Sequence, residues 1–194
     1  MIENLKIGII SNSGLSSLEN SLRYYSDRLP KVEMIVFSEK ENKNLRQLTS
    51  NYEYYQLPSI PDERDYQLIR SELGEYVDTF FVFSTRLIPS LIFDYYKCIN
   101  FHPSKLPLYP GLHGLRNSII NFHLGFTSHF IDCTVDMGKI IETLQITPFP
   151  SEFDVTKIKH ISSRMCSLMI HIVLKKIYLN QLNNSNIISY QAST

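Results

Sequence analysis

The segment PDERDYQLIRSELGEY, Pro61 to Tyr76, followed by TFFVF, Thr79 to Phe83, is the part of the sequence that decides the fold. Pro61 to Tyr76 carries apolar and aromatic side chains at helical spacing. Thr79 to Phe83 is an unbroken apolar run, which is typical of a strand covered on both faces. A helix that leads into a buried strand is one unit of an alternating pattern, and this pair therefore favours a parallel sheet.

The same alternation extends towards the N-terminus. An apolar run at Leu5–Ile10 predicts a strand, Ser16–Arg28 has helical spacing, and Val32–Phe37 predicts a second strand. Parallel strands joined by helices usually form an open sheet with right-handed crossovers. We therefore predict an α/β protein with a Rossmann-like, open, mostly parallel twisted sheet and helices on both faces.

The second half of the chain predicts shorter elements before a long helix. We expect a strand at Cys98–Phe101, a helix at Leu112–Leu124 ended by Gly125, a strand at Thr127–Asp132, an extended piece at Ile140–Thr147 and a terminal helix capped by Asp154. Residues 1–182 are expected to form a single catalytic domain. Residues 183–194 are rich in Asn and Ser, and we expect a loosely ordered tail.

Composition excludes several classes of function. The 194 residues carry 19 basic and 19 acidic side chains, and no basic run interleaved with aromatics would follow a phosphate backbone, so we expect no nucleic-acid partner. No run of about 18 apolar residues and no signal peptide are visible, so neither a membrane span nor export is predicted. Three cysteines without metal-ligand spacing favour reduced thiols, no metal and a cytoplasmic location.

Two segments carry the side chains with the clearest chemistry: KCINFHPSKLPLYPGLHGLR, Lys97 to Arg116, and TSHFIDCTVDMGKII, Thr127 to Ile141. Asn100 and His102 lie at the carboxyl end of a predicted strand, where open parallel sheets bind ligands. Asp136 lies in a loop after a different strand. An amide, an imidazole and a carboxylate can polarise a carbonyl and move protons around it, which indicates acyl transfer.

A less specific interpretation of the same residues stays open, because Asn-x-His-Pro is also a common turn with local hydrogen bonds. His129 falls within a predicted strand, and we expect a structural imidazole there rather than a chemical role. Asp132 is equally compatible with a second acid in the site and with a turn residue. The remaining histidines are assigned no chemistry.

The motifs INFHPSKLPLYPGLHG, HFIDCTVDMGKII and FVFSTRLIPSLIFDYY together resemble the folate-dependent formyltransferases, most closely the phosphoribosylglycinamide formyltransferase branch, to which the sugar N-formyltransferases are related. The likeness extends from about Thr79 to Thr147. It implies catalytic roles for Asn100, His102 and Asp136. It also implies 10-formyltetrahydrofolate as formyl donor, with the pterin held by the loop 131–136 and a neighbouring segment, and the residues concerned are Arg86, Leu87, Ile88, Ile131 and Asp132.

The N-terminal loop departs from that branch, because SNSGLSS has one glycine where the branch has a glycine-rich phosphate loop. Hydroxyls and helix-start N–H groups there could still bind a substrate phosphate, although a polar turn fits equally well, and the residues are Ser11, Asn12, Ser13 and Gly14. Leu108 replaces a basic residue, and no acidic residue and histidine pair is visible near Arg164. These departures favour another phosphorylated or nucleotide-linked amine, for example an amino sugar, over the glycinamide-ribonucleotide-like amine that the resemblance also implies, and both acceptors stay open.

Two alternatives to an active formyltransferase remain. One is a nucleotide-binding Rossmann module, although residues 7–18 hold no Gly-x-Gly-x-x-Gly and Glu39 is the one evident acid at the end of the second predicted strand. The other is a non-catalytic family member that binds without turnover. For each interpretation the sequence is compatible with a monomer or a homodimer.

Overall fold

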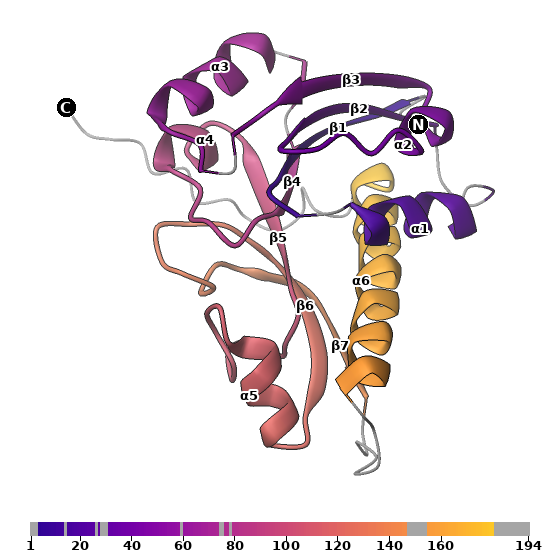
Figure 1. Cartoon of the computed structure of the whole chain (residues 1–194), viewed down its shortest axis with the longest axis vertical. Coiled ribbons are helices and arrows are strands. Elements are labelled where there is room, and N and C mark those ends of the chain that lie inside the picture. The colour runs from indigo at the N-terminus through magenta and orange to yellow at the C-terminus, as the bar shows by residue number, and fades with distance from the viewer. Residues whose placement is uncertain are drawn as a thin grey trace.

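The computed structural model describes residues 4–13, 15–25, 27, 31–58, 60–73, 76–77, 79–146 and 155–180. Its centre is a seven-stranded sheet in the order β3-β2-β1-β4-β5-β6-β7. The first five strands pair in parallel, whereas β6 runs antiparallel to both β5 and β7. This arrangement confirms the predicted α/β fold with a mostly parallel sheet (Figure 1).

The elements alternate along the chain up to β5. The strands are β1 (Asn4–Ser11), β2 (Lys31–Ser38), β3 (Asn51–Gln56), β4 (Thr79–Phe83), β5 (Lys97–His102), β6 (Leu124–Phe130) and β7 (Ile140–Ile146). The helices are α1 (Ser16–Tyr25), α2 (Leu45–Leu48), α3 (Glu63–Leu73), α4 (Ser90–Phe93), α5 (Gly114–Ile120) and α6 (Val155–Tyr178).

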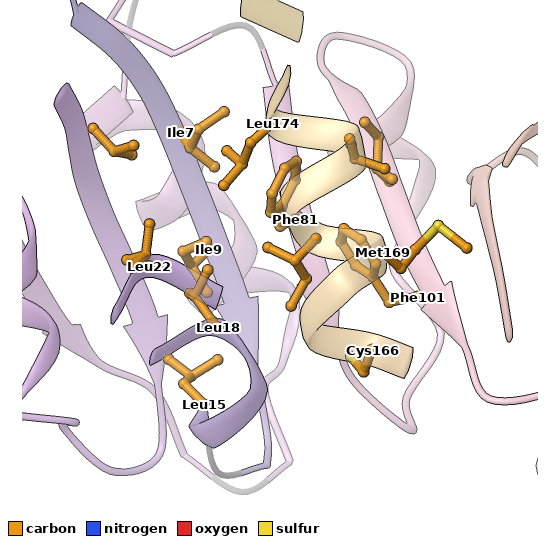
Figure 2. Close-up of a cluster of buried hydrophobic side chains, with 14 of the residues drawn as sticks. Ile7, Ile9, Leu15, Leu18, Leu22, Phe81, Phe101, Cys166, Met169 and Leu174 are labelled. Atoms are coloured by element: carbon orange, nitrogen blue, oxygen red, sulfur yellow. The ribbon is translucent and has the colours of Figure 1, made fainter. Parts of the chain in front are cut away.

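Each face of the sheet is covered by different helices (Figure 1). Helices α1 and α6 lie together on one face, where Leu18, Met169 and Leu174 are fully buried against β1 and β4 (Figure 2). Helices α3 and α4 cover the other face, where Ile69 and Ile92 are fully buried. Two apolar layers therefore fix the sheet and present the carboxyl ends of its parallel strands at one edge.

The central strands β1 and β4 show why a strand that is covered on both faces needs a continuous apolar run. Ile7, Ile9, Phe80 and Phe81 are all fully buried because helices pack on both sides of these central strands. Gly8 leaves room for the ring of Phe80 on the neighbouring strand, since the nearest atoms to a Cβ there would be those of this ring. A side chain at this position would displace the buried ring of Phe80.

The predicted helix at Leu112–Leu124 is the clearest error in the sequence interpretation. Helix α5 ends at Ile120, and Leu124 and Gly125 already belong to β6. Gly125 does not end a helix. It allows the loop after β5 to pass over the strand, because a Cβ there would lie 3.0 Å from Cβ of Lys105.

Several predictions concern residues outside the described part of the chain: Gly14, the cap Asp154 and the tail 183–194. Among the described residues, no helix is both long and apolar enough to cross a membrane.

Candidate active site

The pairing of β5 with β6 brings polar side chains from two distant segments to the same place. Asn100 lies opposite His129 and His102 lies opposite Thr127 in this antiparallel ladder. The register shifts between Ser128 and His129, where β6 leaves the regular ladder with β7. Residues directly opposite each other on one face are close enough to interact, so the pairing places the imidazole of His129 beside the amide of Asn100.

The loop between β6 and β7 carries Asp136 back over the strand ends. Asp132 starts this loop by accepting a hydrogen bond from the N–H of Thr134 at 2.8 Å, which is the turn role that the sequence left open for it. At the end of the loop, Gly138 lets the chain pass close to the end of β6, because a Cβ at this position would overlap the carbonyl oxygen of Phe130, at 1.8 Å. Asp136 itself has φ 54, a left-handed conformation that aspartate tolerates better than most residues.

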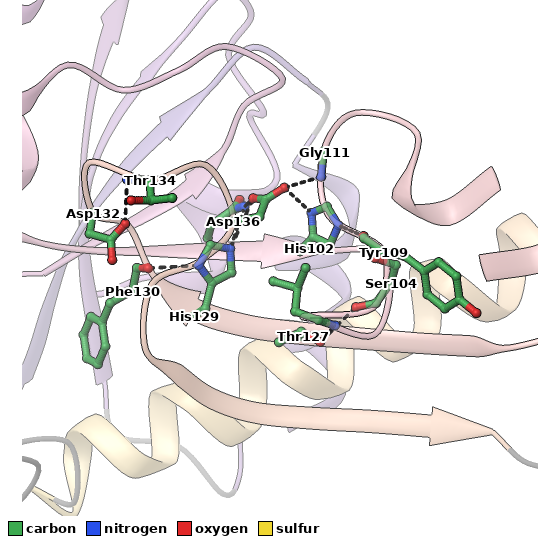
Figure 3. A network of polar contacts seen from close by, with 12 residues as sticks. His102, Ser104, Tyr109, Gly111, Thr127, His129, Phe130, Asp132, Thr134 and Asp136 are labelled. Carbon is green, nitrogen blue, oxygen red and sulfur yellow. Dashed lines mark hydrogen bonds and ion pairs between the residues drawn. The ribbon is translucent and has the colours of Figure 1, made fainter. Parts of the chain in front are cut away.

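Four side chains converge on this point: Asn100, His102, His129 and Asp136. Figure 3 shows the carboxylate of Asp136 between His102 and His129. Oδ2 of Asp136 lies 3.5 Å from Nδ1 of His102, and its Oδ1 lies 3.5 Å from Nε2 of His129. The amide nitrogen of Asn100 is 3.1 Å from Nε2 of His129 and 3.4 Å from Oδ1 of Asp136. The structure thus brings together all three residues that the sequence nominated and adds His129.

The carboxylate of Asp136 is stabilised in its charged form. The hydrogen bond from His129, then the N–H of Gly111 at 2.7 Å and the nearby His102, lower the pKa of Asp136 from 3.8 to about 2 against the opposing effect of burial. His102 behaves differently, because burial lowers its pKa below 6.5 despite the carbonyl of Tyr109 and the charge of Asp136. At neutral pH the cluster therefore pairs a neutral imidazole with a charged carboxylate.

The proton on neutral His102 can be placed from its neighbours. Nε2 lies 2.9 Å from the carbonyl oxygen of Tyr109, and a carbonyl can only accept, so Nε2 carries the hydrogen. Nδ1 then has a free lone pair that faces Asp136. This ring can accept a proton at Nδ1, and it can donate there once it has done so.

The same argument places the protons of His129. Its Nδ1 donates to the carbonyl oxygen of Phe130 at 2.9 Å, so Nε2 accepts from the amide of Asn100 when the ring is neutral. Only the protonated ring also carries a hydrogen on Nε2, and in that form it donates to Oδ1 of Asp136, which is the bond that lowers the pKa of this acid. The sequence interpretation of His129 as a structural imidazole is thus incomplete. The signal that could have placed it is the antiparallel pairing of β5 with β6, which periodicity alone does not predict.

A cleft of about 1010 Å³ opens beside the cluster, at the point where the strand order reverses between β1 and β4. Its walls include Asn100, His102, His129 and Asp136 on one side and the loop after β4 on the other. All five residues expected to hold a pterin line it, namely Arg86, Leu87, Ile88, Ile131 and Asp132. The volume is at the upper end of the roughly 300–1,000 Å³ typical of small-molecule sites.

A second cavity of about 620 Å³ adjoins the cleft, because Ser13 lines both. Its remaining walls come from Asn12, the start of α1 and the segment 39–44 after β2. Ser11 lies outside both cavities: it is buried, and its hydroxyl hydrogen bonds to the carbonyl oxygens of Ser13 in the turn and of Phe83 at the end of β4. Of the four predicted phosphate ligands, Asn12 and Ser13 line the second cavity, whereas Gly14 is outside the described residues.

No group of three or more His, Cys, Asp and Glu residues within the described ranges has a geometry that could hold a metal ion. What the cluster offers is a carboxylate, two imidazoles and an amide at the wall of a cleft, which is a set suited to proton transfer and to stabilising a developing negative charge. The arrangement defines a group-transfer site.

The sequence profile of the formyl transferase family matches residues 25–164, well over half of the chain. The chain therefore belongs to the formyl transferase family, as its motifs predicted. Solved structures support the fold at low sequence identity. Glycinamide ribonucleotide transformylase 1 from Symbiobacterium toebii has a TM-score of 0.77 at 19% identity, with 93% of this chain and 90% of that chain covered.

Two further structures are similar. Phosphoribosylglycinamide formyltransferase from Streptococcus pneumoniae TIGR4 gives a TM-score of 0.72 at 20% identity, covering 90% of this chain and 99% of that one. The enzyme of the same name from Bacillus halodurans gives 0.68 at 22% identity, covering 89% and 96%. The formyltransferase fold therefore extends beyond the segment in which the sequence motifs were found.

Proposed function

We propose that this formyltransferase moves a formyl group from 10-formyltetrahydrofolate to the primary amine of a phosphorylated small molecule. The observation that carries the proposal is the convergence of Asn100, His102 and Asp136 at the wall of a cleft large enough for a folate. The backbone of Arg86, Leu87 and Ile88 and the loop from Ile131 to Asp136 form the walls that would hold the pterin. When bound, the donor supplies an activated formyl group.

The charge states of the cluster support a defined order of proton transfers. An unprotonated amine attacks the formyl carbon, a nitrogen–carbon bond forms, and the attacking nitrogen becomes acidic. Nδ1 of His102 has a free lone pair and faces the Asp136 carboxylate, so this pair can accept the surplus proton directly or through a water. The proton then returns to the nitrogen that leaves the formyl carbon as its bond to that carbon breaks.

The same groups can stabilise the formyl oxygen as it gains negative charge. His102 becomes a donor at Nδ1 after protonation, so its charge state follows the reaction. The amide of Asn100 can donate as well, but its nitrogen contacts His129 and Asp136 in this structure. Use of that amide for the oxygen therefore requires that one of these two contacts is exchanged for the substrate.

The second cavity supports an acceptor that carries a negative charge. Lys40 and Lys43 line it together with Asn12 and Ser13, and so do two acids, Glu39 and Glu41. Glu41 is paired with Arg46 at 3.0 Å, so the two lysines face one further carboxylate, that of Glu39. A phosphate placed here would lie beside the cleft, because Ser13 borders both spaces. The volume of about 620 Å³ also admits a nucleotide-linked amine, so the choice between the two is left to experiment.

A formyl-transfer assay tests the proposal. The protein is mixed with 10-formyltetrahydrofolate and a panel of amines, including glycinamide ribonucleotide, nucleotide-linked amino sugars and unphosphorylated analogues, while release of tetrahydrofolate is followed. We expect turnover with a phosphorylated amine and a loss of about a hundredfold or more in His102→Ala, since one lost donor in a comparable site costs about 3–4 kcal/mol. Asp136→Asn should also lower turnover, because it removes the negative charge that faces His102. Donor binding without turnover would instead indicate a non-catalytic family member.

The acceptor site has its own control. Lys43→Gln should raise KM for the phosphorylated amine and leave KM for the donor unchanged, whereas Lys31→Gln, at the opposite end of β2, should change neither. Equal effects of the two substitutions would argue against an anion in the second cavity.

The predicted cytoplasmic location is consistent with the free thiols of the buried Cys98 and Cys166.

A further inference from the structure

A hydrogen bond outside the catalytic cluster connects the cluster, through Tyr109, to His123, a residue that belongs to none of the motifs. The hydroxyl of Tyr109 lies 2.5 Å from Nδ1 of His123, while the backbone carbonyl of the same tyrosine accepts from Nε2 of His102 at 2.9 Å. Tyr109 therefore joins two histidines that lie 21 positions apart in the sequence. We propose that the Tyr109–His123 pair is a positioning device that fixes the tautomer of His102.

The carbonyl of Tyr109 is confined on several sides. Besides His102, it accepts from the hydroxyl of Ser104 at 2.6 Å. A Cβ on Gly114 would lie 2.5 Å from this oxygen and 2.6 Å from Nε2 of His102, so the start of α5 closes over the bond. The His102 hydrogen bond is therefore enclosed by Ser104, Tyr109 and Gly114, and it is sensitive to small movements of the tyrosine.

The loop that carries Tyr109 has firm attachments on one side. Buried Thr127 accepts from the N–H of Leu106 at 3.1 Å and donates to the carbonyl of Ser104 at 2.8 Å, which fixes the start of the loop to β6. The following residues Pro107, Leu108 and Pro110 are exposed. Within this part, the N–H of Tyr109 donates to the carbonyl of Lys105 at 3.1 Å, and Gly111 beyond it donates to Asp136 at 2.7 Å. The bond from the Tyr109 hydroxyl to His123 is the attachment made by its side chain.

His123 is a suitable anchor because its own backbone is fixed. It follows α5 directly, and its N–H donates to the carbonyl of Ser118 at 2.8 Å. The preceding Phe122 adopts φ 56, which turns the chain from α5 into β6 within three residues. The buried Leu124 follows. The backbone of His123 is therefore fixed, and the bond to its ring connects Tyr109 to this fixed point.

The tautomer of His102 depends on a competition between two acceptors. The Tyr109 carbonyl faces Nε2 at 2.9 Å, and the Asp136 carboxylate faces Nδ1 at 3.5 Å. A neutral imidazole has one hydrogen and can serve one of them. While Tyr109 is held, the hydrogen stays on Nε2 and Nδ1 remains a base. If Tyr109 moves away, the carboxylate is expected to draw the hydrogen to Nδ1, and the basic lone pair facing the site is lost.

The inference concerns the proposed formyl-transfer site, and its test is chosen to succeed or fail without an acceptor. Two-bond ¹H–¹⁵N spectra of the ¹⁵N-labelled protein report which nitrogen of each histidine is protonated, and His102→Gln identifies the His102 signals by their loss. In the wild type we expect the Nε2–H tautomer. In Tyr109→Phe and His123→Ala a substantial Nδ1–H population should appear, while circular dichroism shows an unchanged fold.

Two further variants separate positioning from general stability. His123→Asn places a carbonyl oxygen near the position of Nδ1 and should restore the Nε2–H tautomer by accepting from Tyr109. Tyr95→Phe removes an exposed hydroxyl but keeps the ring on which Arg70 lies, and should leave the His102 signals unchanged. Wild-type tautomer ratios in both Tyr109→Phe and His123→Ala would overturn the inference.

Turnover provides the second measurement once an accepted amine is known. Loss of one hydrogen bond changes a rate by about tenfold at most. Tyr109→Phe and His123→Ala should therefore lower kcat about three- to tenfold and leave KM for the donor unchanged. His123→Asn should recover most of the lost kcat. If the tautomer shifts but the wild type forms no product, the positioning device stands and the proposed function fails. An unchanged kcat in variants whose tautomer has shifted would contradict the catalytic part of the inference.

Discussion

The charge on Asp136 depends on the groups that surround it, and so does its contribution to folding. Its carboxylate accepts from the N–H of Gly111 and lies between two imidazoles, which keeps its pKa near 2. A carboxylate whose pKa is lower in the folded chain stabilises that chain at every pH above its unfolded value. The same contacts that prepare the site for chemistry therefore also stabilise the loop between β6 and β7.

The two shifted groups predict separate pH windows for stability. The Asp136 contribution is complete above pH 3.8 and disappears as the pH falls towards about 2, with a size of about 2 kcal/mol. The pKa of His102 is lower in the folded chain than its usual 6.5. Below pH 6.5 the unfolded chain therefore binds a proton at this residue more readily than the folded chain does, and the free energy of unfolding falls there too. Urea unfolding between pH 7.5 and 2.5 measures both.

Single substitutions assign each window to its residue. His102→Gln should flatten the change just below pH 6.5, and Asp136→Asn should flatten the change below pH 3.8. Asn is a fair replacement because it also tolerates the left-handed backbone at this position. A pH dependence in Asp136→Asn equal to that of the wild type below pH 3.8 would show that the carboxylate is not stabilised by its neighbours.

At the scale of elements, the loop between β6 and β7 positions the acid for the site. Gly138 permits this path, since the position that a Cβ would take lies 1.8 Å from the Phe130 carbonyl. We predict that Gly138→Ala displaces the loop, lowers the free energy of unfolding and reduces formyl transfer by at least about tenfold, because a misplacement of about 1 Å can cost a hundredfold.

Gly111 provides a comparison for this prediction. A Cβ there meets nothing within 4 Å, but its φ of 81 is unfavourable for alanine. Gly111→Asn should therefore be milder than Gly111→Ala, since asparagine tolerates positive φ, whereas Gly138→Asn should be as harmful as Gly138→Ala. Thermal unfolding and formyl transfer measured on all four variants distinguish a steric from a conformational requirement.

The sequence could predict those elements that have a strong period of their own. The apolar run Thr79–Phe83 corresponds to β4, and the helical spacing of Ser16–Arg28 includes the whole of α1, because burial on both faces or on one face leaves a local pattern. The boundary of α5 could not be predicted in this way. Gly125 lies in β6 rather than at the helix end, and its glycine is explained by the approach of Lys105, a contact between residues that the local pattern does not relate.

The same distinction applies to the site. Asn100, His102 and Asp136 could be nominated because they stand in recognisable motifs, whereas His129 and His123 could not. The role of His129 depends on the antiparallel register of β5 with β6, and that of His123 on a hydrogen bond to a loop residue. Neither relation has a periodic signal in the sequence, so both require the fold.

At the scale of the whole molecule, the two halves of the sheet are joined by α6. This helix packs on α1 and also on β6, so its buried face connects the parallel part of the sheet to the antiparallel part that holds His129. Leu174 is fully buried, whereas Leu168 in the same helix is 38% exposed. The apolar contacts of α6 should therefore determine global stability without touching the chemistry.

We predict that Leu174→Ala lowers the free energy of unfolding by about 2–5 kcal/mol, because it leaves a cavity between α6 and the sheet. Leu168→Ala is the matched control and should cost less than about 1 kcal/mol, since much of its side chain is already in water. Urea unfolding gives both values. Formyl transfer per folded molecule, measured well below the melting temperature, should be unchanged in both variants, because neither residue lines the cleft. A large loss of kcat in folded Leu174→Ala would mean that packing under α6 also sets the geometry of the site, and α6 would then belong to the catalytic machinery as well as to the core.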